Sequence, residues 1–199
     1  MEKIKIIALF GKSGAGKDTI QRWITKNFIN TYSIVSHTTR PPRDYEVDGK
    51  DYHFITDKEF TKLLIKKKIL EFSSFNSWKY GTCIDALDPD GINIGVFNPQ
   101  GIRNLLKLSD TLEVLPVWIQ ADDKTRLMRS LNREKAPNCK EICRRFLADE
   151  EDFSHIDFDY EIYLNSNFSN EYYGFFNRPK VLDFLGGRPP IERTNLIVG

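Results

Sequence analysis

The sequence predicts an α/β fold in which a parallel central sheet is covered by helices on both faces, giving three layers. Apolar β-like runs alternate with helix-like segments, and no segment repeats another. The first apolar run leads through a glycine-rich turn into an amphipathic helix. With 199 residues, the chain can bury one sizeable core with a small inserted subdomain, but two full domains are not expected.

The strands of this sheet are expected at five short apolar runs, residues 3–10, 33–36, 92–97, 112–119 and 158–164. The helix after the first strand carries an apolar stripe made of Ile20, Trp23, Ile24 and Phe28. Three further helices are expected at residues 100–108, 122–133 and 140–153. Pro99 and the Asp122–Asp123 pair stand where the first two of these begin, as is typical of helix starts.

Between residues 38 and 80 the rhythm changes to short aromatic strands, at 52–55 and 69–73. They flank a helix that begins with a capping box from Thr56 to Glu59. This block predicts an inserted, partly antiparallel subdomain. Beyond Asn177 the Arg-Pro and Gly-Gly pairs fit no regular element, so residues 178–199 are expected to form an irregular tail.

The charge balance and the composition exclude several classes of binding partner. The 29 Lys and Arg nearly cancel the 28 Asp and Glu, so the overall field that attracts nucleic acid or an acidic membrane is missing. The start carries no cleavable signal, and no apolar run approaches the roughly 20 residues of a membrane span. We expect a cytoplasmic protein without nucleic-acid or membrane partners. The odd cysteine count, Cys83, Cys139 and Cys143, fits a reducing compartment. Cys139 and Cys143 lie four apart with no His or second cysteine pair nearby, so they are interpreted as packing residues and not as zinc ligands.

The strongest chemical motif lies between the first strand and the first helix, and it consists of Gly11, Lys12, Ser13, Gly14, Ala15, Gly16 and Lys17. Glycines allow successive backbone N–H groups to surround an anion, and the following helix start adds partial positive charge. Lys17 stands where a lysine reaches the β- and γ-phosphates of a nucleotide. One position departs from the motif, because Asp18 replaces the usual Ser or Thr and Thr19 comes one place late.

A second set of residues is suited to another phosphate group. Arg40 and Arg43 lie three apart and are separated by two prolines, which stiffen the pair. An acid, Glu71, and the Tyr80-Gly81-Thr82 run follow on a different part of the predicted subdomain.

Taken together, these motifs resemble the guanylate kinase family. The resemblance rests on residues 11–17, 36–43, 47–52, 71, 80–82 and 100–101, and it extends to Phe158-Asp159 and Asn165. It covers about the first 165 residues, and the combination of motifs is highly specific. No counterpart is found for the tail.

The resemblance implies a P-loop fold with a core at residues 1–36 and 82–177, a monophosphate-binding insert at 37–81 and a helical lid at about 122–153. It implies transfer of the γ-phosphoryl group of ATP to GMP or dGMP with Mg²⁺. The ATP site would comprise Gly11, Ser13, Gly14, Ala15, Gly16, Lys17, Asp18, Thr19 and Asn165. Arg40, Arg43, Tyr52 and Tyr80 would hold the acceptor phosphate, and Ser36, Glu71 and Thr82 would contact guanine. The catalytic residues would be Lys17, Arg40, Arg133 and Arg145, with Arg144 an open alternative to Arg145.

The chain departs from the family pattern at two acids. Family members carry two aspartates before the Gln-Gly pair, where this chain has Val96 and Asn98. We hypothesise that Asp18 compensates by supplying the carboxylate that organises Mg²⁺. The alternative is that Asp18 is only a helix-start charge.

Three other functions stay open at this stage. The first is a kinase of the same fold acting on another phosphorylated acceptor, such as a different nucleotide or a ribose bisphosphate. The second is a non-catalytic guanylate-kinase-like binding module, although such modules have usually lost the phosphate loop. The third, a P-loop ATPase or GTPase switch, leaves Arg40, Arg43 and Tyr80 unexplained. Oligomeric state is also open, because the aromatic residues at 168, 172, 173, 175 and 176 could form core or a subunit interface.

Overall fold

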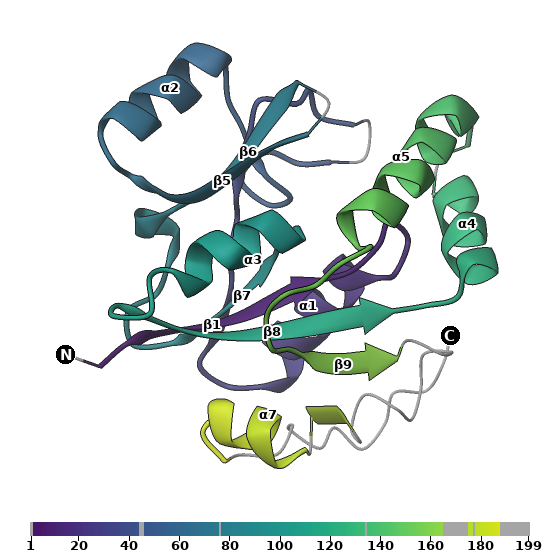
Figure 1. Cartoon of the computed structure of the whole chain (residues 1–199). Coiled ribbons are helices and arrows are strands. Elements are labelled where there is room, and N and C mark those ends of the chain that lie inside the picture. The colour runs from purple at the N-terminus through teal and green to yellow at the C-terminus, as the bar shows by residue number, and fades with distance from the viewer. Residues whose placement is uncertain are drawn as a thin grey trace.

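The computed structural model (Figure 1) describes residues 2–43, 46–75, 77–133, 135–164, 175–176 and 178–187. In these residues, the larger sheet has the strand order β2-β7-β1-β8-β9, and every neighbouring pair is parallel. Its strands are β1 (Ile4–Phe10), β2 (Thr31–Ser33), β7 (Ile92–Val96), β8 (Leu112–Gln120) and β9 (Glu161–Leu164). The predicted α/β class with a parallel central sheet is therefore confirmed.

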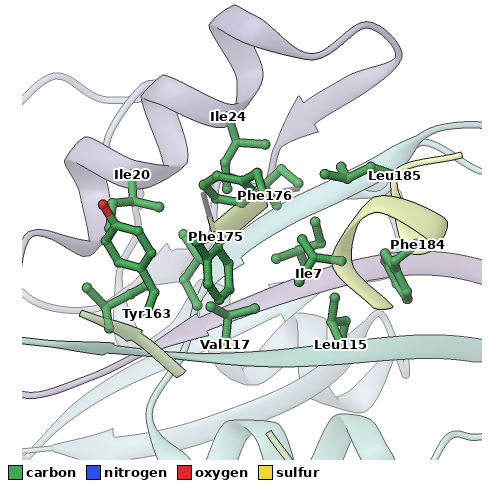
Figure 2. Close-up of a cluster of buried hydrophobic side chains, with 14 of the residues drawn as sticks. Ile7, Ile20, Ile24, Leu115, Val117, Tyr163, Phe175, Phe176, Phe184 and Leu185 are labelled. Atoms are coloured by element: carbon green, nitrogen blue, oxygen red, sulfur yellow. The ribbon is translucent and has the colours of Figure 1, made fainter. Parts of the chain in front are cut away.

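Helices cover both faces of this sheet because the side chains of β1 alternate between them. Ile7 and Leu9 share an apolar cluster with residues of α1 (Lys17–Asn27), and Figure 2 shows Ile7 in that cluster with Ile20 and Ile24 of α1. On the other face, Ile6, Ala8 and Phe10 pack in a second cluster that includes residues of α3 (Pro99–Leu106). The central strand thus contributes to two cores.

The insert forms a second, smaller sheet with the order β4-β3-β6-β5. Its strands are β3 (His37–Thr38), β4 (His53–Phe54), β5 (Ile69–Phe75) and β6 (Trp78–Cys83), and a 3₁₀ turn, η1 (Ile84–Ala86), follows. The pairing is partly antiparallel, as predicted, since only β3 and β4 run parallel. Helix α2 (Asp57–Ile65) begins with the predicted capping box, in which Thr56 and Glu59 bond to each other's backbone N–H.

Two helices, α4 (Asp123–Asn132) and α5 (Cys139–Asp152), agree with the predicted helices to within a residue. They fall in the region where a lid is expected, and we call them the lid pair. Asp122 and Asn138 cap them by accepting hydrogen bonds from the backbone N–H groups of Thr125 and Glu141. In Figure 1 the insert and the lid pair both rise above the main sheet, and α7 lies below it.

Two predicted strands differ in extent from those observed. The strand expected at 33–36 lies at Thr31–Ser33, beside β7. The last strand begins at Glu161 rather than at residue 158. Phe158 and Tyr160 leave the ladder because their rings pack on Phe10, with centroids 5.5 and 5.8 Å away.

The prediction of an irregular tail is wrong for residues 179–184, which form helix α7 (Pro179–Phe184). The reason is burial: Val181, Phe184 and Leu185 join the core on the α1 side of the sheet. Gly186 and Gly187, both with positive φ, follow the last turn. Residues 188–199 lie outside the described part of the chain.

Other expectations concern single side chains. Phe175 and Phe176 are buried in the core, and the three other members of that aromatic run are not among the described residues. Cys83 is buried, whereas Cys139 and Cys143 are exposed on α5, so the interpretation of these two as packing residues is wrong. Across the described ranges, none of the helices has the length and apolar character needed to cross a bilayer.

Candidate active site

The phosphate loop, residues 11–17, joins the end of β1 to the start of α1. A Cβ on Gly11 would lie 2.3 Å from the carbonyl oxygen of Ile119, and one on Gly14 would lie 2.4 Å from that of Arg126. Gly14 also has φ of +79°, in the left-handed region that favours glycine. The loop therefore packs directly against the backbones of β8 and α4, where any larger residue would clash.

Lys17 folds back across this loop. Its Nζ donates to the carbonyl oxygens of Gly11 (2.7 Å) and Lys12 (3.2 Å). Burial lowers the pKa of Lys17, and the carboxylates of Asp18 and Asp149 oppose that shift. An ammonium group next to backbone N–H groups at a helix start makes a site suited to a polyphosphate.

Asp18 and Thr19 lie on the first turn of α1, and both line the central cavity described below. At the end of β7, Val96 also lines it, while the Asn98 side chain caps α3 by accepting a hydrogen bond from the Gly101 N–H (2.7 Å). In the described part of the chain, no three His, Cys, Asp or Glu side chains are grouped to hold a metal ion. Mg²⁺ binds through one or two carboxylates, water and substrate phosphates, so the exposed Asp18 beside the loop fits such an ion.

The two arginines of the insert are held by a carboxylate that the sequence analysis did not select. Glu46 accepts a hydrogen bond from Arg40 Nη2 (2.7 Å) and another from the backbone N–H of Arg43 (2.8 Å). Burial raises the pKa of Glu46, but the bonds from Arg40 and Arg43 outweigh it and bring that pKa below its usual value. The Arg40 guanidinium also lies 5.7 Å from the ring centroids of Tyr52 and Phe54.

The predicted base-reading residues Ser36, Glu71 and Thr82 form one chain of hydrogen bonds. Thr82 Oγ1 donates to Glu71 Oε1 (2.9 Å) and lies 3.1 Å from Ser36 Oγ. Glu71 is 7% exposed, and this burial raises its pKa to about 7 in spite of the bond from Thr82. Gly101 leaves room for this carboxylate in its present position, because a Cβ there would lie 2.9 Å from Glu71 Oε2 and would displace it.

The lid pair brings several arginines near the loop. Arg145 Nε donates to Glu141 (2.8 Å), and Arg144 bonds to the same carboxylate. These hydrogen bonds lower the pKa of Glu141 to about 2, and the bond from Arg144 has the largest effect. Of the candidate arginines, Arg133 and Arg145 line the central cavity, and Arg144 lies outside its lining.

One cavity of about 930 Å³ joins these parts. The loop contributes Ser13, Gly14, Gly16 and Lys17, the insert contributes Arg40, Arg43, Tyr52 and Tyr80, and the lid pair contributes Arg133 and Arg145. Ser36 lines it too, whereas Glu71 and Thr82 lie buried behind this lining. Of the sequence candidates, Asn165 lies outside the described residues.

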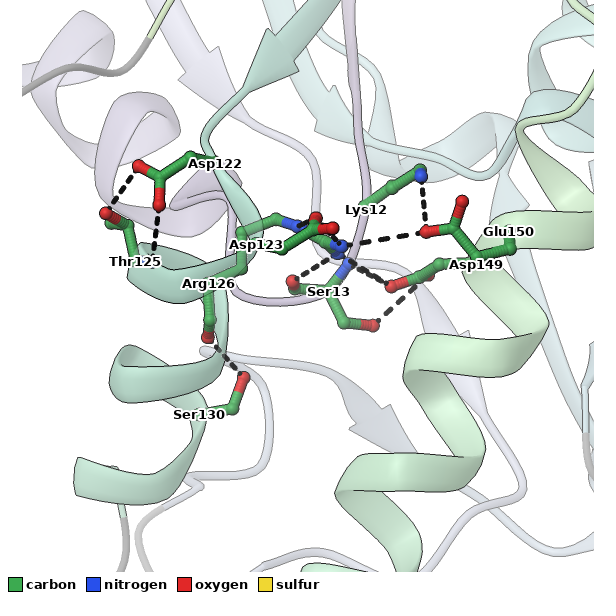
Figure 3. Close-up of polar contacts among 9 residues, drawn as sticks. All are labelled: Lys12, Ser13, Asp122, Asp123, Thr125, Arg126, Ser130, Asp149 and Glu150. Atoms are coloured by element: carbon green, nitrogen blue, oxygen red, sulfur yellow. Dashed lines mark hydrogen bonds and ion pairs between the residues drawn. The ribbon is translucent and has the colours of Figure 1, made fainter.

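Sequence reasoning missed three charged residues that hold the site, Glu46, Arg126 and Asp149. Arg126, on α4, is 1% exposed and bonds to Ser13, Asp123 and Asp149, as Figure 3 shows. The spacing of Glu46 three residues after Arg43 was an available signal. Arg126 has the same spacing from Asp123, but on a helix that spacing predicts only a solvated surface pair, and Asp149 offered no signal.

Comparison with known proteins agrees with this geometry. The family model described as guanylate kinase matches residues 3–174. A guanylate kinase of Malacoplasma penetrans is 35% identical over 153 residues, covering 72% of this chain and 68% of that protein. A guanylate kinase of Schizosaccharomyces pombe is 44% identical over 86 residues, and this match spans only 43% of each chain.

The crystal structure of guanylate kinase from Anaplasma phagocytophilum has the same fold. It superposes with a TM-score of 0.57 and 18% identity, covering 84% of this chain and 80% of that one. The fold and the family match over most of the sequence lead to one conclusion: the chain belongs to the guanylate kinase family of nucleoside monophosphate kinases.

Proposed function

We propose that this protein transfers the γ-phosphoryl group of ATP to GMP or dGMP, giving GDP or dGDP, with Mg²⁺ as the metal. The observation that carries the proposal is the single cavity, since the phosphate loop and the Arg40–Arg43 pair line the same space. Two separate cationic sites in one cavity suit two phosphorylated ligands. A hydrolase needs only the first of them.

The acceptor would bind on the insert side. Arg40 and Arg43 can donate to a phosphate, and Tyr52 and Tyr80 line the same space. Behind them, an ionised Glu71 can accept from both N1–H and the 2-amino group of guanine. Adenine presents no such donor pair, so a wrong base leaves the buried carboxylate unpaired.

The transfer needs no covalent enzyme intermediate. An oxygen of the acceptor phosphate forms a bond to Pγ as the bond from Pγ to the β,γ-bridging oxygen breaks, and ADP leaves with that electron pair. Lys17 would stabilise the charge on the transferring group, and Arg133 and Arg145 would add positive charge from the lid pair. Closure of the insert and the lid pair over the cavity would exclude water and so prevent ATP hydrolysis.

Bound Mg²⁺ would neutralise charge on the β- and γ-phosphates. Asp18 would help to hold it, directly or through water, in place of the family's strand acids. The adenine contact assigned to Asn165 is also part of this proposal and rests on the sequence alone.

A coupled phosphotransfer assay tests the proposal. ATP and Mg²⁺ are supplied with GMP, dGMP, AMP, CMP, UMP, dTMP or a ribose bisphosphate in turn, and Lys17→Ala serves as the inactive control. We expect turnover with GMP or dGMP that exceeds turnover with every other acceptor. Three results would overturn the proposal. Preference for another acceptor would indicate a kinase of the same fold with a different substrate, and ATP hydrolysis without acceptor would indicate an NTPase. Nucleotide binding without turnover would indicate a binding module.

A further inference from the structure

Both backbone polar groups of Ser13, in the phosphate loop, are held by side chains of the lid pair. The Ser13 N–H donates to Asp149 Oδ2 on α5 (2.7 Å), and the Ser13 carbonyl accepts from Arg126 Nη1 on α4 (3.1 Å). Arg126 Nη1 also donates to Asp149 Oδ2 (3.2 Å), so the contacts form a closed ring. We call Ser13, Arg126 and Asp149 the loop clasp; Figure 3 shows it.

The clasp is buried and tightly packed. Only 1% of the Arg126 side chain and 13% of the Asp149 side chain are exposed. The guanidinium lies 4.4 Å from the centroid of the Phe146 ring, and Asp123 binds its other side at 2.7 Å. Charged groups this buried hold their geometry because neither can move without losing a partner.

The clasp acts on the loop from outside the cavity. Ser13 and Gly14 line the cavity, whereas Arg126 and Asp149 lie outside its lining. Their charges still reach the site: burial lowers the pKa of Lys17 most, Asp149 opposes that shift, and Arg126 adds to it. The inner side of the loop is thus left to a ligand while the outer side is fixed by protein.

We propose that Arg126 and Asp149 are positioning residues that pre-form the phosphate loop for ATP and couple its shape to the lid pair. The inference rests on the proposed function for the identity of the ligand. A loop that already has its bound shape loses less conformational entropy on binding. Because Arg133 is the C-cap residue of α4 and Arg145 lies on α5, the same helices would set both the loop and the closing arginines.

The test compares Asp149→Ala with Asp123→Ala. Both variants remove a carboxylate partner of Arg126, but within the described residues only Asp149 of the two accepts a hydrogen bond from Ser13. Asp149→Ala removes the acceptor that holds the Ser13 N–H and hydroxyl. We expect it to weaken ATP binding in calorimetry about tenfold and to raise KM for ATP equally. KM for GMP should stay within about twofold and kcat within about threefold, because the cavity side is unchanged.

Hydrogen exchange of the nucleotide-free protein gives a readout that does not depend on activity. The peptide covering residues 11–17 should exchange faster in Asp149→Ala and at the native rate in Asp123→Ala. Asp149→Asn keeps the side-chain volume and an acceptor for the Ser13 N–H, so its exchange rate should fall between those of the two alanine variants. This variant remains informative if Asp149→Ala does not fold.

Equal ATP affinity and equal loop exchange in the Asp149 and Asp123 variants would overturn the inference and leave the clasp a helix-to-helix contact. A wild-type protein that binds ATP but does not phosphorylate GMP would instead overturn the proposed function. In that case the binding and exchange results would still decide the clasp.

Discussion

The two halves of the cavity carry their positive charge by different means. On the loop side, the anion site consists of backbone N–H groups, a helix start and Lys17, and its shape is fixed by residues outside the cavity. On the insert side, the site consists of side chains, and the buried Arg40 is paired with Glu46 inside it. The loop side should therefore tolerate loss of its charge without unfolding, while the insert side should lose binding and stability together.

The largest expected effect is on the loop side. Lys17→Met should lower kcat by a factor on the order of 10³, because the ammonium is lost from the transferring group. Stability should not fall, since burial already disfavours the charged lysine, whose pKa it lowers. Single-turnover kinetics and thermal unfolding measure the two effects. A kcat within tenfold of the wild type, or a large loss of stability, would contradict the difference drawn between the halves.

The second-largest effect is expected on the insert side, where one substitution should alter both GMP binding and stability. Arg40→Met should raise KM for GMP about 100-fold and lower the free energy of unfolding by about 3 kcal/mol, because the buried Glu46 loses its 2.7 Å ion pair and keeps only its contacts with Arg43. The double variant Arg40→Met, Glu46→Gln should recover most of the stability but none of the affinity. Denaturant unfolding and steady-state kinetics measure this, and equal stability of the single and double variants would show that the pair is not coupled.

A third prediction uses the pH dependence of Glu71. Its pKa rises from 4.5 to about 7 on folding, so the folded protein binds more protons than the unfolded chain between these values. The resulting stabilisation, ~3 kcal/mol, is fully present below pH 4.5 and is lost as the pH rises through 7. Glu71→Gln should remove this part of the pH dependence, as measured by denaturant unfolding from pH 4.5 to 8.

The same group should affect acceptor binding in the opposite direction. A protonated Glu71 cannot accept from both guanine donors, so KM for GMP should rise as the pH falls below about 7. KM for ATP, on the loop side, should not follow this curve. A parallel shift of both constants, or an unchanged profile in Glu71→Gln, would assign the pH dependence to another group.

The smallest effect is expected at Asp18. Asp18→Asn should raise the Mg²⁺ concentration needed for half-maximal activity severalfold, and it should weaken Mn²⁺ binding to the ATP complex measured by electron paramagnetic resonance. Stability should barely change, because Asp18 is exposed. Asp51→Asn, which changes a carboxylate of the same cavity on the insert side, is the control. If the two variants have the same metal dependence, Asp18 is only a helix-start charge.

Sequence patterns predicted the features that depend on neighbouring residues. The step from β1 through the glycines into α1, and the capping box at Thr56 and Glu59, are local and were recognised. Strand β3 was missed because two residues, His37 and Thr38, are strand only through their pairing with β4 and β6. Helix α7 was missed because it is short and is stabilised by burial of its apolar residues in the core, which the local sequence does not reveal.

The supporting charges of the site were missed for a related reason. In sequence, Glu46, Arg126 and Asp149 look like solvated surface residues. Their burial depends on segments far apart in the chain, since Arg126 meets Ser13 across 113 positions. Motifs thus identified candidate residues that line the cavity, whereas the residues that hold them carry no motif.

The central place of β1 has a consequence for how the molecule opens. This strand lies between β7 and β8, and its alternate side chains belong to both apolar clusters. Partial unfolding that frees α7, the insert or the lid pair leaves at least one of these layers intact. The backbone amides of β1 should therefore exchange with solvent only in global unfolding. The glycine-rich loop that follows β1 is thus anchored to a stable strand when the surrounding parts open.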